Sequence, residues 1–431
     1  MLKNKDLFFK KRILIYGVGK SGLSAYKFLK KNNKLYLYDD KKIDYKNKKY
    51  LLNYKKLIKK KIDYIIISPG ININKCNLNK YLKRNKKKIY TDLDIFFSSF
   101  NKNKSITITG TNGKSTTAQI LYEIFKKQKI DVRLVGNIGN PILLEKNIKD
   151  KTIFVIEASS YQLEYSKIFK SNVAAILNIS PDHLERHKTL KKYITAKFKL
   201  IKNQTKKDFA ILNTNNIHIK KQIKTQKYLS KIIKVNKKVK PAVLKKINNP
   251  YFETDGNKEN LAFIFEIIKI FAIKKKNIFK VLKNFQGLKY RQQVIFRSKD
   301  LIIINDSKAT SFSSSVSILK TLSNVYWIIG GLKKKGDKFL LSRNDCKNFK
   351  AYIFGKDRRF FIKELKNTIK FESFINLKLL IKKIFLDIYR DKERKTILFS
   401  PAAASFDNFK NFEERGKYFN NLIKKLTYVK R

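Results

Sequence analysis

Residues 105–116 read SITITGTNGKST, an apolar run followed by a loop of glycine and small hydroxyl residues. Residues 105–109 are typical of a buried β-strand, and the amphipathic stretch after the loop is typical of a helix. Between a strand and a helix, glycines let backbone N–H groups approach phosphate oxygens, and the helix N-terminus favours negative charge. The segment therefore predicts a nucleotide phosphate-binding loop at residues 110–116, within a parallel α/β sheet.

The residue types in this loop indicate a role for each position. Lys114 supplies a cation for the β and γ phosphates, and Ser115 or Thr116 offers a hydroxyl to Mg²⁺. The usual P-loop has a glycine five residues before its Gly-Lys pair, where this chain has Ile108. The shorter loop indicates a subset of ATP-using proteins, and the alternative is a Gly/Ser-rich turn with an incidental lysine. The predicted ATP contacts here are Gly110, Thr111, Asn112, Gly113, Lys114, Ser115 and Thr116.

The net charge of +66 would, taken alone, indicate a nucleic-acid or anionic-membrane partner. The lysines, however, are spread over nearly every polar segment and arginine is scarce, which is typical of a gene from an AT-rich genome. Zinc-finger, RRM and basic-zipper motifs are absent from the sequence. We therefore expect no specific nucleic-acid partner, although a basic nucleic-acid-binding ATPase is one alternative.

The length and the cysteine content favour a large cytoplasmic enzyme. A chain of 431 residues with 43% hydrophobic residues suffices for two to four domains. The start, MLKNKDLFFKKR, has no signal-peptide apolar run, and no later run approaches the roughly 18 residues of a membrane span. Cys76 and Cys346 match no metal or redox spacing and are expected to be reduced thiols.

The first segment of the chain carries a GxGxxG pattern between a strand and a helix. Residues 12–16 form an apolar run that leads into Gly17, Gly19 and Gly22, and a second predicted strand ends at Asp39. A third predicted strand, residues 64–67, is followed by Ser-Pro-Gly70. On its own, this pattern predicts a Rossmann-type NAD site with Asp39 on a ribose, so an NAD-dependent dehydrogenase is another alternative.

The second segment places polar side chains after two apolar strands. TIFVIEASSYQLE carries Glu157 and Ser159, and VAAILNISPDHLERH carries Asp182 and His183. Ligands of open α/β sheets bind outside the carboxyl ends of the strands, so Glu157 is predicted to hold Mg²⁺ beside Ser115. The alternatives are a solvated residue or helix cap for Glu157 and a surface turn for His183.

The third segment, from about Gly287, has four further strands that end in polar or small residues and predict another parallel sheet. Asp306, Lys308 and Thr310 follow the first of these strands, Ser405 follows the last, and all four are candidates for binding an anionic substrate. A helix N-cap is the alternative for Asp306 and Ser307. Segments 214–255 and 356–392 show no motif that we can interpret.

The order of these motifs, GxGxSG, SPG, GTNGKST, GNIG, EASSYQLE, SPDHLERH, NDSKAT and SPAAASFDNFKNFEERG, resembles the Mur ligases over essentially the whole chain. The resemblance implies an α/β fold of three domains: a Rossmann-like UDP-binding domain (1–92), a central P-loop ATPase-like domain (93–287) and a C-terminal Rossmann-like domain (288–431) for the amino acid. NDSKAT and SPAAASFD are similar to the branch that adds D-glutamate to UDP-N-acetylmuramoyl-L-alanine in peptidoglycan synthesis. Another Mur-type amino-acid ligase is the nearest alternative.

The resemblance also implies sites for the nucleotide substrate and the metal. Ser115 and Glu157 match one Mg²⁺ site, while His183 and Lys197, expected to be carbamoylated, match the second. Catalytic roles fall on Lys114, His183, Lys197 and Lys308. The positions matching contacts of the UDP-linked substrate are Lys20, Ser21, Gly22, Asp39, Gly70, Asn137, Ser159 and His183.

For the remaining ligands, the resemblance implies ATP contacts at Asn257, Arg291 and Asp306, besides Lys308. The D-glutamate pocket matches Thr310, Ser405, Phe412 and Lys334, with Lys333 and Lys335 as alternatives for the lysine. The implied reaction makes an acyl phosphate from ATP and the alanyl carboxylate, which the amine of D-glutamate then attacks. We expect a monomer that closes about hinges on its ligands.

Overall fold

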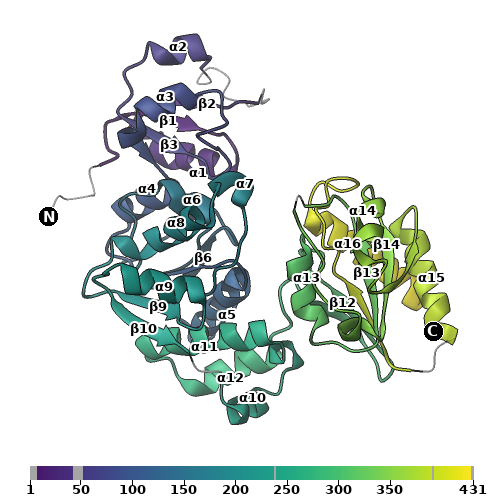
Figure 1. The fold of residues 1–431 in the computed structure, drawn as a ribbon. Helices are drawn as coiled ribbons and strands as arrows, with labels where there is room; N and C mark the ends of the chain where they lie inside the picture. Colours follow the sequence, from purple (N-terminus) through teal and green to yellow (C-terminus); the bar gives the residue numbers. More distant parts are fainter. Residues whose placement is uncertain (1–6, 42–51, 237–238, 335, 391–392, 429–431) are drawn as a thin grey trace. The chain divides into compact units, whose positions relative to one another are not determined.

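The computed structural model describes residues 7–41, 52–236, 239–334, 336–390 and 393–428 (Figure 1). It divides into two compact units. Unit 1 comprises Met1–Asn248 and Asn257–Lys283, and unit 2 comprises Asn249–Gly256 and Asn284–Arg431. The fold of each unit is α/β, with sheets whose strands are mostly parallel.

The first sheet of unit 1 has the order β2-β1-β3-β4, and all of its neighbouring strands are parallel. Alternate residues of β1 face opposite sides: Leu14 and Tyr16 pack with α2 and α3, whereas Ile13 and Ile15 pack with α1 and α4. The elements are β1 Arg12–Tyr16, α1 Lys20–Leu29, β2 Lys34–Tyr38, α2 Tyr54–Ile58, β3 Tyr64–Ile67, α3 Asn79–Arg84, η3 Lys86–Lys88, β4 Ile89–Tyr90 and α4 Asp92–Ser99.

The second sheet of unit 1 has the order β10-β9-β8-β5-β7-β6 and is parallel throughout. Its central strand, β5, precedes the phosphate loop and is buried along its whole length, as its apolar run predicts. The strands are β5 Ser105–Thr109, β6 Val132–Gly136, β7 Ile153–Glu157, β8 Val173–Ile176, β9 Phe209–Asn213 and β10 Lys231–Val235.

Helices connect the strands of the second sheet, and in the described part of the chain four more helical elements follow its last strand, of which the one at residues 250–252 belongs to unit 2. The helical elements are α5 Lys114–Lys127, η4 Ile142–Leu144, α6 Ser160–Tyr165, α7 Leu184–His187, α8 Leu190–Lys202, α9 Ile217–Thr225, α10 Pro241–Ile247, η5 Pro250–Phe252, α11 Asp255–Ile270 and α12 Lys275–Asn284. One hydrophobic core runs from the first sheet into the second, because Phe96 of α4 packs edge-on against Phe154 of β7 at a centroid distance of 4.8 Å. This shared core explains why both sheets belong to one compact unit.

The sheet of unit 2 has the order β11-β12-β16-β13-β14-β15. It is parallel except for β11, which runs antiparallel to β12 at the edge. Its elements are β11 Gln293–Arg297, β12 Leu301–Asn305, α13 Phe312–Leu319, β13 Val325–Gly330, η6 Asn344–Cys346, β14 Phe349–Phe354, α14 Arg358–Leu365, β15 Lys370–Ser373, α15 Leu377–Arg390, β16 Lys395–Phe399 and α16 Phe412–Tyr428.

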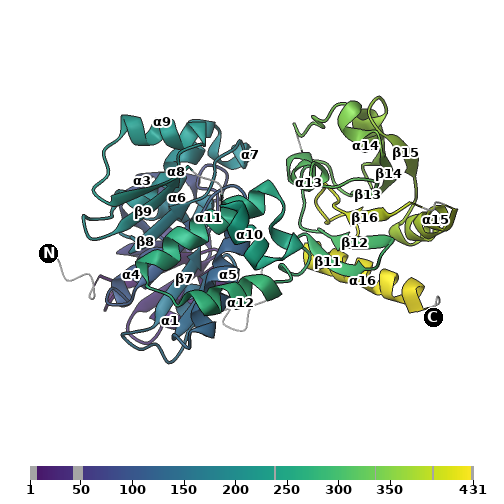
Figure 2. The same cartoon turned by 90° about the horizontal axis from the view of Figure 1, so that it is seen from below.

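Two helical layers cover this sheet, as Figure 2 shows. Helices α13 and α14 pack on one face with Trp327 and Leu398, and α15 and α16 pack on the other with Ile328 and Ile397. Consecutive strand residues therefore point into opposite cores, which is the side-chain period of a β-strand.

The predicted strands before Gly17, Asp39, Gly70 and the phosphate loop are confirmed, as is the helix that begins at Lys114. The antiparallel strand β11 corrects the expectation of a purely parallel third sheet. The helix N-cap interpretation of Asp306 and Ser307 is wrong, because α13 begins at Phe312 with Ser311 as its N-cap residue. Within the described part of the chain, no helix is both long and apolar enough to cross a membrane.

Candidate active site

The phosphate loop connects β5 to α5 with a backbone turn that requires glycine. Gly113, the N-cap residue of α5, has a φ of 83°, in the left-handed region that side chains disfavour. A Cβ atom there would lie 3.0 Å from Cγ of Asn260 and still nearer to its Oδ1. The loop therefore passes too close to α11 for any residue but glycine, and the first N–H groups of α5 face the position where phosphate binds in such loops.

Lys114, the predicted phosphate cation, lies directly over this loop. Its Nζ donates hydrogen bonds to the carbonyl oxygens of Gly110 and Thr111, at 2.9 and 2.7 Å. The ammonium group is therefore held within the loop and is available to anionic oxygens that approach it.

Ser115 and Glu157, predicted to share one metal ion, are brought together by β7 and α5. The Oγ of Ser115 donates to Oε2 of Glu157 at 2.6 Å, and Nδ2 of Asn137 donates to Oε1 at 2.8 Å. Glu157 is 1% exposed, so the interpretation as a solvated residue is wrong. A buried carboxylate and a hydroxyl beside a phosphate loop are hard oxygen ligands of the kind Mg²⁺ prefers.

Lys197 lies on the inner face of α8, with 1% of its surface exposed. Its Nζ donates to the carbonyl oxygen of Gly110 at 2.7 Å and lies 4.5 Å from the ring centroid of Tyr193. Burial lowers the pKa of Lys197 well below its ordinary value, and the charge of Lys114 acts in the same direction. The neutral amine is therefore far more populated here than in an exposed lysine.

His183 begins the short helix α7 with a φ of 54°, which is unusual for a residue with a side chain. Its Nδ1 lies 3.0 Å from Oη of Tyr161, and its Nε2 lies 3.4 Å from Oδ2 of Asp182. Its ring packs edge-on against Tyr193, the same ring that lies beneath Lys197. Tyr193 therefore connects two predicted metal ligands.

The donor set around the phosphate loop fits Mg²⁺ at one position better than at the other. Among the described residues, no three His, Cys, Asp or Glu side chains group as a metal site. Ser115 and Glu157 nevertheless provide oxygens beside the phosphate loop. Lys197 as an amine is no ligand for Mg²⁺, and only a carbamate on this lysine would supply oxygens.

The glycine loop of the first sheet is braced by side chains. A Cβ atom on Gly22 would overlap the carbonyl oxygen of Gly17, so the helix meets the loop too closely for any residue but glycine. The carboxylate of Asp39 accepts a hydrogen bond from the N–H of Val18 at 2.7 Å. The Oγ of Ser21 donates to the buried Asp92 at 2.6 Å. Predicted substrate residues of this loop are thus fixed by neighbours.

Four other predicted substrate or nucleotide residues have clear structural surroundings in unit 1. Ser159 caps α6: its Oγ accepts from the N–H of Gln162 at 3.2 Å. Asn257 accepts from Nδ2 of Asn260 at 3.4 Å, and Asn260 is the residue that crowds Gly113. Lys20 is the first residue of α1, and Gly70 lies in the turn after β3, where a Cβ atom would meet no other atom within 4 Å.

In unit 2, Asp306 lies at the carboxyl end of β12 and is buried. Its carboxylate accepts from Oγ of Ser400 at 3.0 Å and from the N–H of Gln292 at 3.1 Å. Burial raises the pKa of Asp306 to about 7, although both hydrogen bonds and the charges of Arg291 and Arg415 act in the opposite direction. The group is thus able to exist in either protonation state near neutral pH.

The predicted D-glutamate residues of unit 2 follow the same ends of the strands. Lys308 Nζ lies 4.1 Å from the ring centroid of Phe412. This contact brings together two residues of the predicted sites. Thr310 is exposed and Ser405 is buried. Lys333 Nζ lies over the ring of Phe360 at 5.4 Å. Lys334 is half-buried, and Lys335 lies outside the described residues.

The sequence pattern of the Mur ligase middle domain matches residues 108–279. A UDP-N-acetylmuramoylalanine--D-glutamate ligase of Rickettsia bellii is 32% identical over 97% of this chain and 98% of its own. One of Rickettsia prowazekii is 34% identical over 97% and 99%. The chain belongs to the Mur ligase family. Family membership disfavours the dehydrogenase and the nucleic-acid-binding ATPase.

Solved Mur ligases share the fold at low sequence identity. UDP-N-acetylmuramate-alanine ligase MurC of Thermotoga maritima has a TM-score of 0.58 and 15% identity, covering 96% of this chain and 99% of its own. The MurF ligase of Thermotoga maritima in complex with ADP has a TM-score of 0.56 and 14% identity, covering 97% and 99%. These likenesses support an α/β Mur ligase fold.

One residue that contacts the loops of the predicted site in unit 2, Arg415, was not predicted from the sequence. Arg415 is fully buried, and its Nη2 donates to the carbonyl oxygens of Ser307 and Ala403, at 2.7 and 2.9 Å. It joins the loops that carry Lys308 and Ser405. The arginine in FEERG was visible, but nothing in the sequence indicated which loops it would connect.

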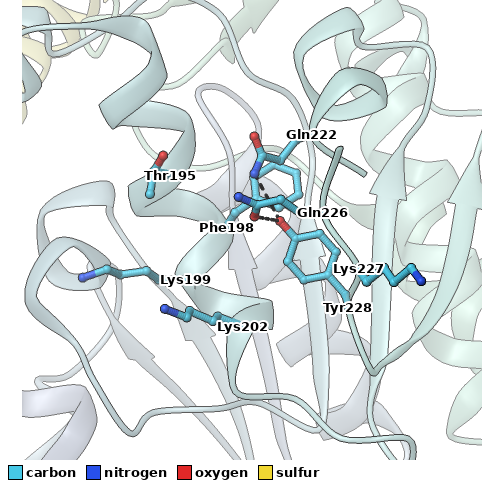
Figure 3. A pocket seen from close by; sticks show the side chains of 8 residues that line it. All are labelled: Thr195, Phe198, Lys199, Lys202, Gln222, Gln226, Lys227 and Tyr228. Atoms are coloured by element: carbon cyan, nitrogen blue, oxygen red, sulfur yellow. Dashed lines mark hydrogen bonds between the residues drawn. The ribbon is translucent and has the colours of Figure 1, made fainter. Parts of the chain in front are cut away.

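A separate cavity of about 400 Å³ lies between α8 and α9 (Figure 3). Its centre is the ring pair Phe198 and Tyr228, whose centroids are 5.7 Å apart. The amines of Lys199 and Lys202 extend away from these rings in Figure 3, and Lys199 donates to the carbonyl oxygen of Glu164. None of the predicted site residues lines this cavity, so we assign it no role in the reaction.

Proposed function

We propose that this Mur ligase joins D-glutamate to UDP-N-acetylmuramoyl-L-alanine with hydrolysis of ATP to ADP and phosphate. The observation that carries the proposal is the 32–34% identity, over nearly the whole chain, to relatives named for that reaction. The product would be a precursor of peptidoglycan. The phosphate loop with Lys114, and the buried pair Ser115 and Glu157, support the use of ATP with Mg²⁺.

We assign the binding of ATP to residues 110–116 in unit 1, with Asn257 beside them, and to Arg291 and Asp306 in unit 2. Ser115 and Glu157 would hold one Mg²⁺, and His183 with a carbamoylated Lys197 would hold a second. The metal ions would neutralise phosphate charge when bound. Lys114 and Lys308 contribute fixed positive charge to the same end, without a covalent intermediate on the protein.

The reaction that these groups serve has two steps. An oxygen of the alanyl carboxylate attacks the γ-phosphorus of ATP, the bond to ADP breaks, and an acyl phosphate forms. The amine of D-glutamate then attacks the acyl carbon, loses a proton, and phosphate leaves as the amide bond forms. The protein's contribution is to hold the reacting atoms in line and exclude water.

The carbamate on Lys197 would form when the neutral Nζ attacks CO₂ and releases one proton. Burial, the hydrogen bond from Nζ to Gly110 and the lowered pKa of Lys197 support this reaction. The product is a carboxylate that can face a cation, whereas an ammonium group would repel it. Asp182 also lies near Lys197. With the carbamate present, Asp182 would not be the sole source of the negative charge that faces the cation.

We divide the chain by function into three domains, residues 1–92, 93–287 and 288–431, for the UDP-linked substrate, ATP and D-glutamate. Lys20, Ser21, Gly22, Asp39 and Gly70 would contact the UDP group; Asn137, Ser159 and His183 would contact the muramoyl-alanine end; Thr310, Lys334, Ser405 and Phe412 would contact D-glutamate. We further propose a cytoplasmic monomer that makes no membrane insertion.

The test is an amino-acid panel in a phosphate-release assay with ATP, Mg²⁺ and UDP-N-acetylmuramoyl-L-alanine. We expect turnover with D-glutamate and far less with L-glutamate, diaminopimelate or lysine. Equal turnover with diaminopimelate would instead favour another Mur-type ligase. No phosphate release with any amino acid would refute the proposal.

A further inference from the structure

One asparagine outside the predicted site, Asn178, makes three hydrogen bonds to residues 111 and 112 in the first half of the phosphate loop. It follows β8 by two residues, in the stretch LNISPDH. The N–H of Thr111 donates to its carbonyl oxygen at 2.9 Å. The N–H of Asn112 donates to its Oδ1 at 2.8 Å, and its Nδ2 donates back to the carbonyl oxygen of Asn112 at 3.3 Å. One side chain thus pairs with both backbone polar groups of one loop residue, Asn112.

The amide of Asn178 also interacts with a carboxyl group on another element, Glu259 of α11. Nδ2 of Asn213 donates to Oε1 of Glu259 at 2.6 Å. Burial raises the pKa of Glu259, and the polar side chains of Asn213 and Asn178 act in the opposite direction. Because a carboxylate only accepts, it requires the NH₂ group of Asn178 on its side and leaves Oδ1 for the N–H of Asn112. The carboxylate therefore selects the amide orientation that the loop needs.

The second half of the loop is fixed by the same helix. Asn260, the neighbour of Glu259, lies against Gly113. Residues of α11 therefore touch the loop directly at Gly113 and indirectly, through Asn178, at Asn112. Such an arrangement holds the loop in one shape, so that binding of phosphate does not first have to order it.

We propose that Asn178 is a positioning residue for the nucleotide phosphates, and that Glu259 acts on the loop through Asn178. The proposal rests on the assignment of ATP to residues 110–116. It extends that assignment because neither side chain was predicted to take part, and neither is assigned any contact with the substrates.

The experiment measures the affinity of the full-length protein for Mg-ADP and for adenosine by isothermal titration calorimetry. In Asn178→Ala the loop loses two hydrogen bonds from a side chain, and we expect ADP to bind about tenfold or more weakly. Adenosine, which has no phosphate, should bind with unchanged affinity. Asn213→Ala is the matched control, because Asn213 donates to Glu259, whereas within the described chain its side chain makes no hydrogen bond to residues 110–116.

Glu259→Gln keeps the size of the side chain and serves if Asn178→Ala fails to fold. We expect it to weaken ADP binding by several-fold in the otherwise unchanged protein. In the Asn178→Ala background it should have no further effect, because its influence passes through that amide. An ADP affinity that is unchanged in both single variants, or lowered equally by Asn213→Ala, would overturn the proposal.

The measurement separates this proposal from the proposed function. ADP binding does not depend on which amino acid the enzyme uses. A protein that binds Mg-ADP through the loop and responds to Asn178→Ala, yet fails in the D-glutamate assay, would uphold the positioning role and refute only the substrate. A protein that binds no Mg-ADP would refute both.

Discussion

The replacement of Gly113 by alanine tests whether the phosphate loop and α11 are packed as tightly as the structure shows. Gly113 has a φ of 83°, and an alanine in this left-handed conformation costs roughly 1–2 kcal/mol. Its Cβ atom would overlap the side chain of Asn260, which is 4% exposed and donates to Asn257. Displacing that buried amide from its partner costs about 1–3 kcal/mol. The expected loss is therefore about 2–5 kcal/mol of unfolding free energy.

The assay is urea unfolding of unit 1, and the readout is far-ultraviolet circular dichroism. Trp327, the single tryptophan, is buried in unit 2 and reports that unit separately. In an Asn260→Ala background the overlap is gone, so Gly113→Ala should then cost only about 1–2 kcal/mol. Gly70→Ala, also in unit 1, where a Cβ atom meets nothing within 4 Å, is the control and should not destabilise. The same loss with and without the Asn260 side chain would refute the packing argument.

Three further predictions concern charged groups. Lys114→Ala should lower kcat by about two or more orders of magnitude with an unchanged circular dichroism spectrum, and near-normal turnover would contradict its role at the phosphates. Lys197→Ala should be nearly inactive in the phosphate-release assay and should regain part of the activity with formate or acetate, whereas full activity would show that a carbamate is dispensable. Asp306→Asn tests the raised pKa of Asp306: folded protein keeps a proton that unfolded protein releases, so wild-type stability should fall as pH rises from about 4 to about 7. Urea unfolding followed by Trp327 fluorescence should show that the unfolding free energy of the variant, relative to that of wild type, rises by up to about 4 kcal/mol between pH 4 and pH 8. A difference that does not depend on pH would contradict the raised pKa of Asp306.

The sequence predicted the strands that are apolar along nearly their whole length, such as β7 and β13, because buried parallel strands need no polar alternation. It did not predict β10 or β15. Both are edge strands whose residues are largely half-buried or exposed, so they lack the apolar run that identifies a strand. β11 was also not predicted. It is an edge strand with several exposed residues, and its pairing with β12 contains a bulge.

For the site, the sequence predicted groups whose chemistry is visible in the residue type. Lys114 with its glycines and Glu157 after a strand are of this kind, and the structure brings Glu157 to Ser115 as expected. Asn178 and Arg415 were not predicted, because an amide or a guanidinium acts there through partners distant in sequence. Their roles depend on which loops the fold brings together, and that information is absent from local patterns.

The position of β16 in its sheet determines when unit 2 can complete its fold during synthesis. This strand is the last of its sheet along the chain, yet it lies between β12 and β13 and pairs with both, for example Ile303 with Ile397 and Ile328 with Phe399. A nascent chain that has not yet reached residue 395 holds β12 and β13 with apolar, unpaired edges and no strand between them. Such edges can pair with other chains, and the sheet of unit 2 can close this gap only after its final strand has left the ribosome.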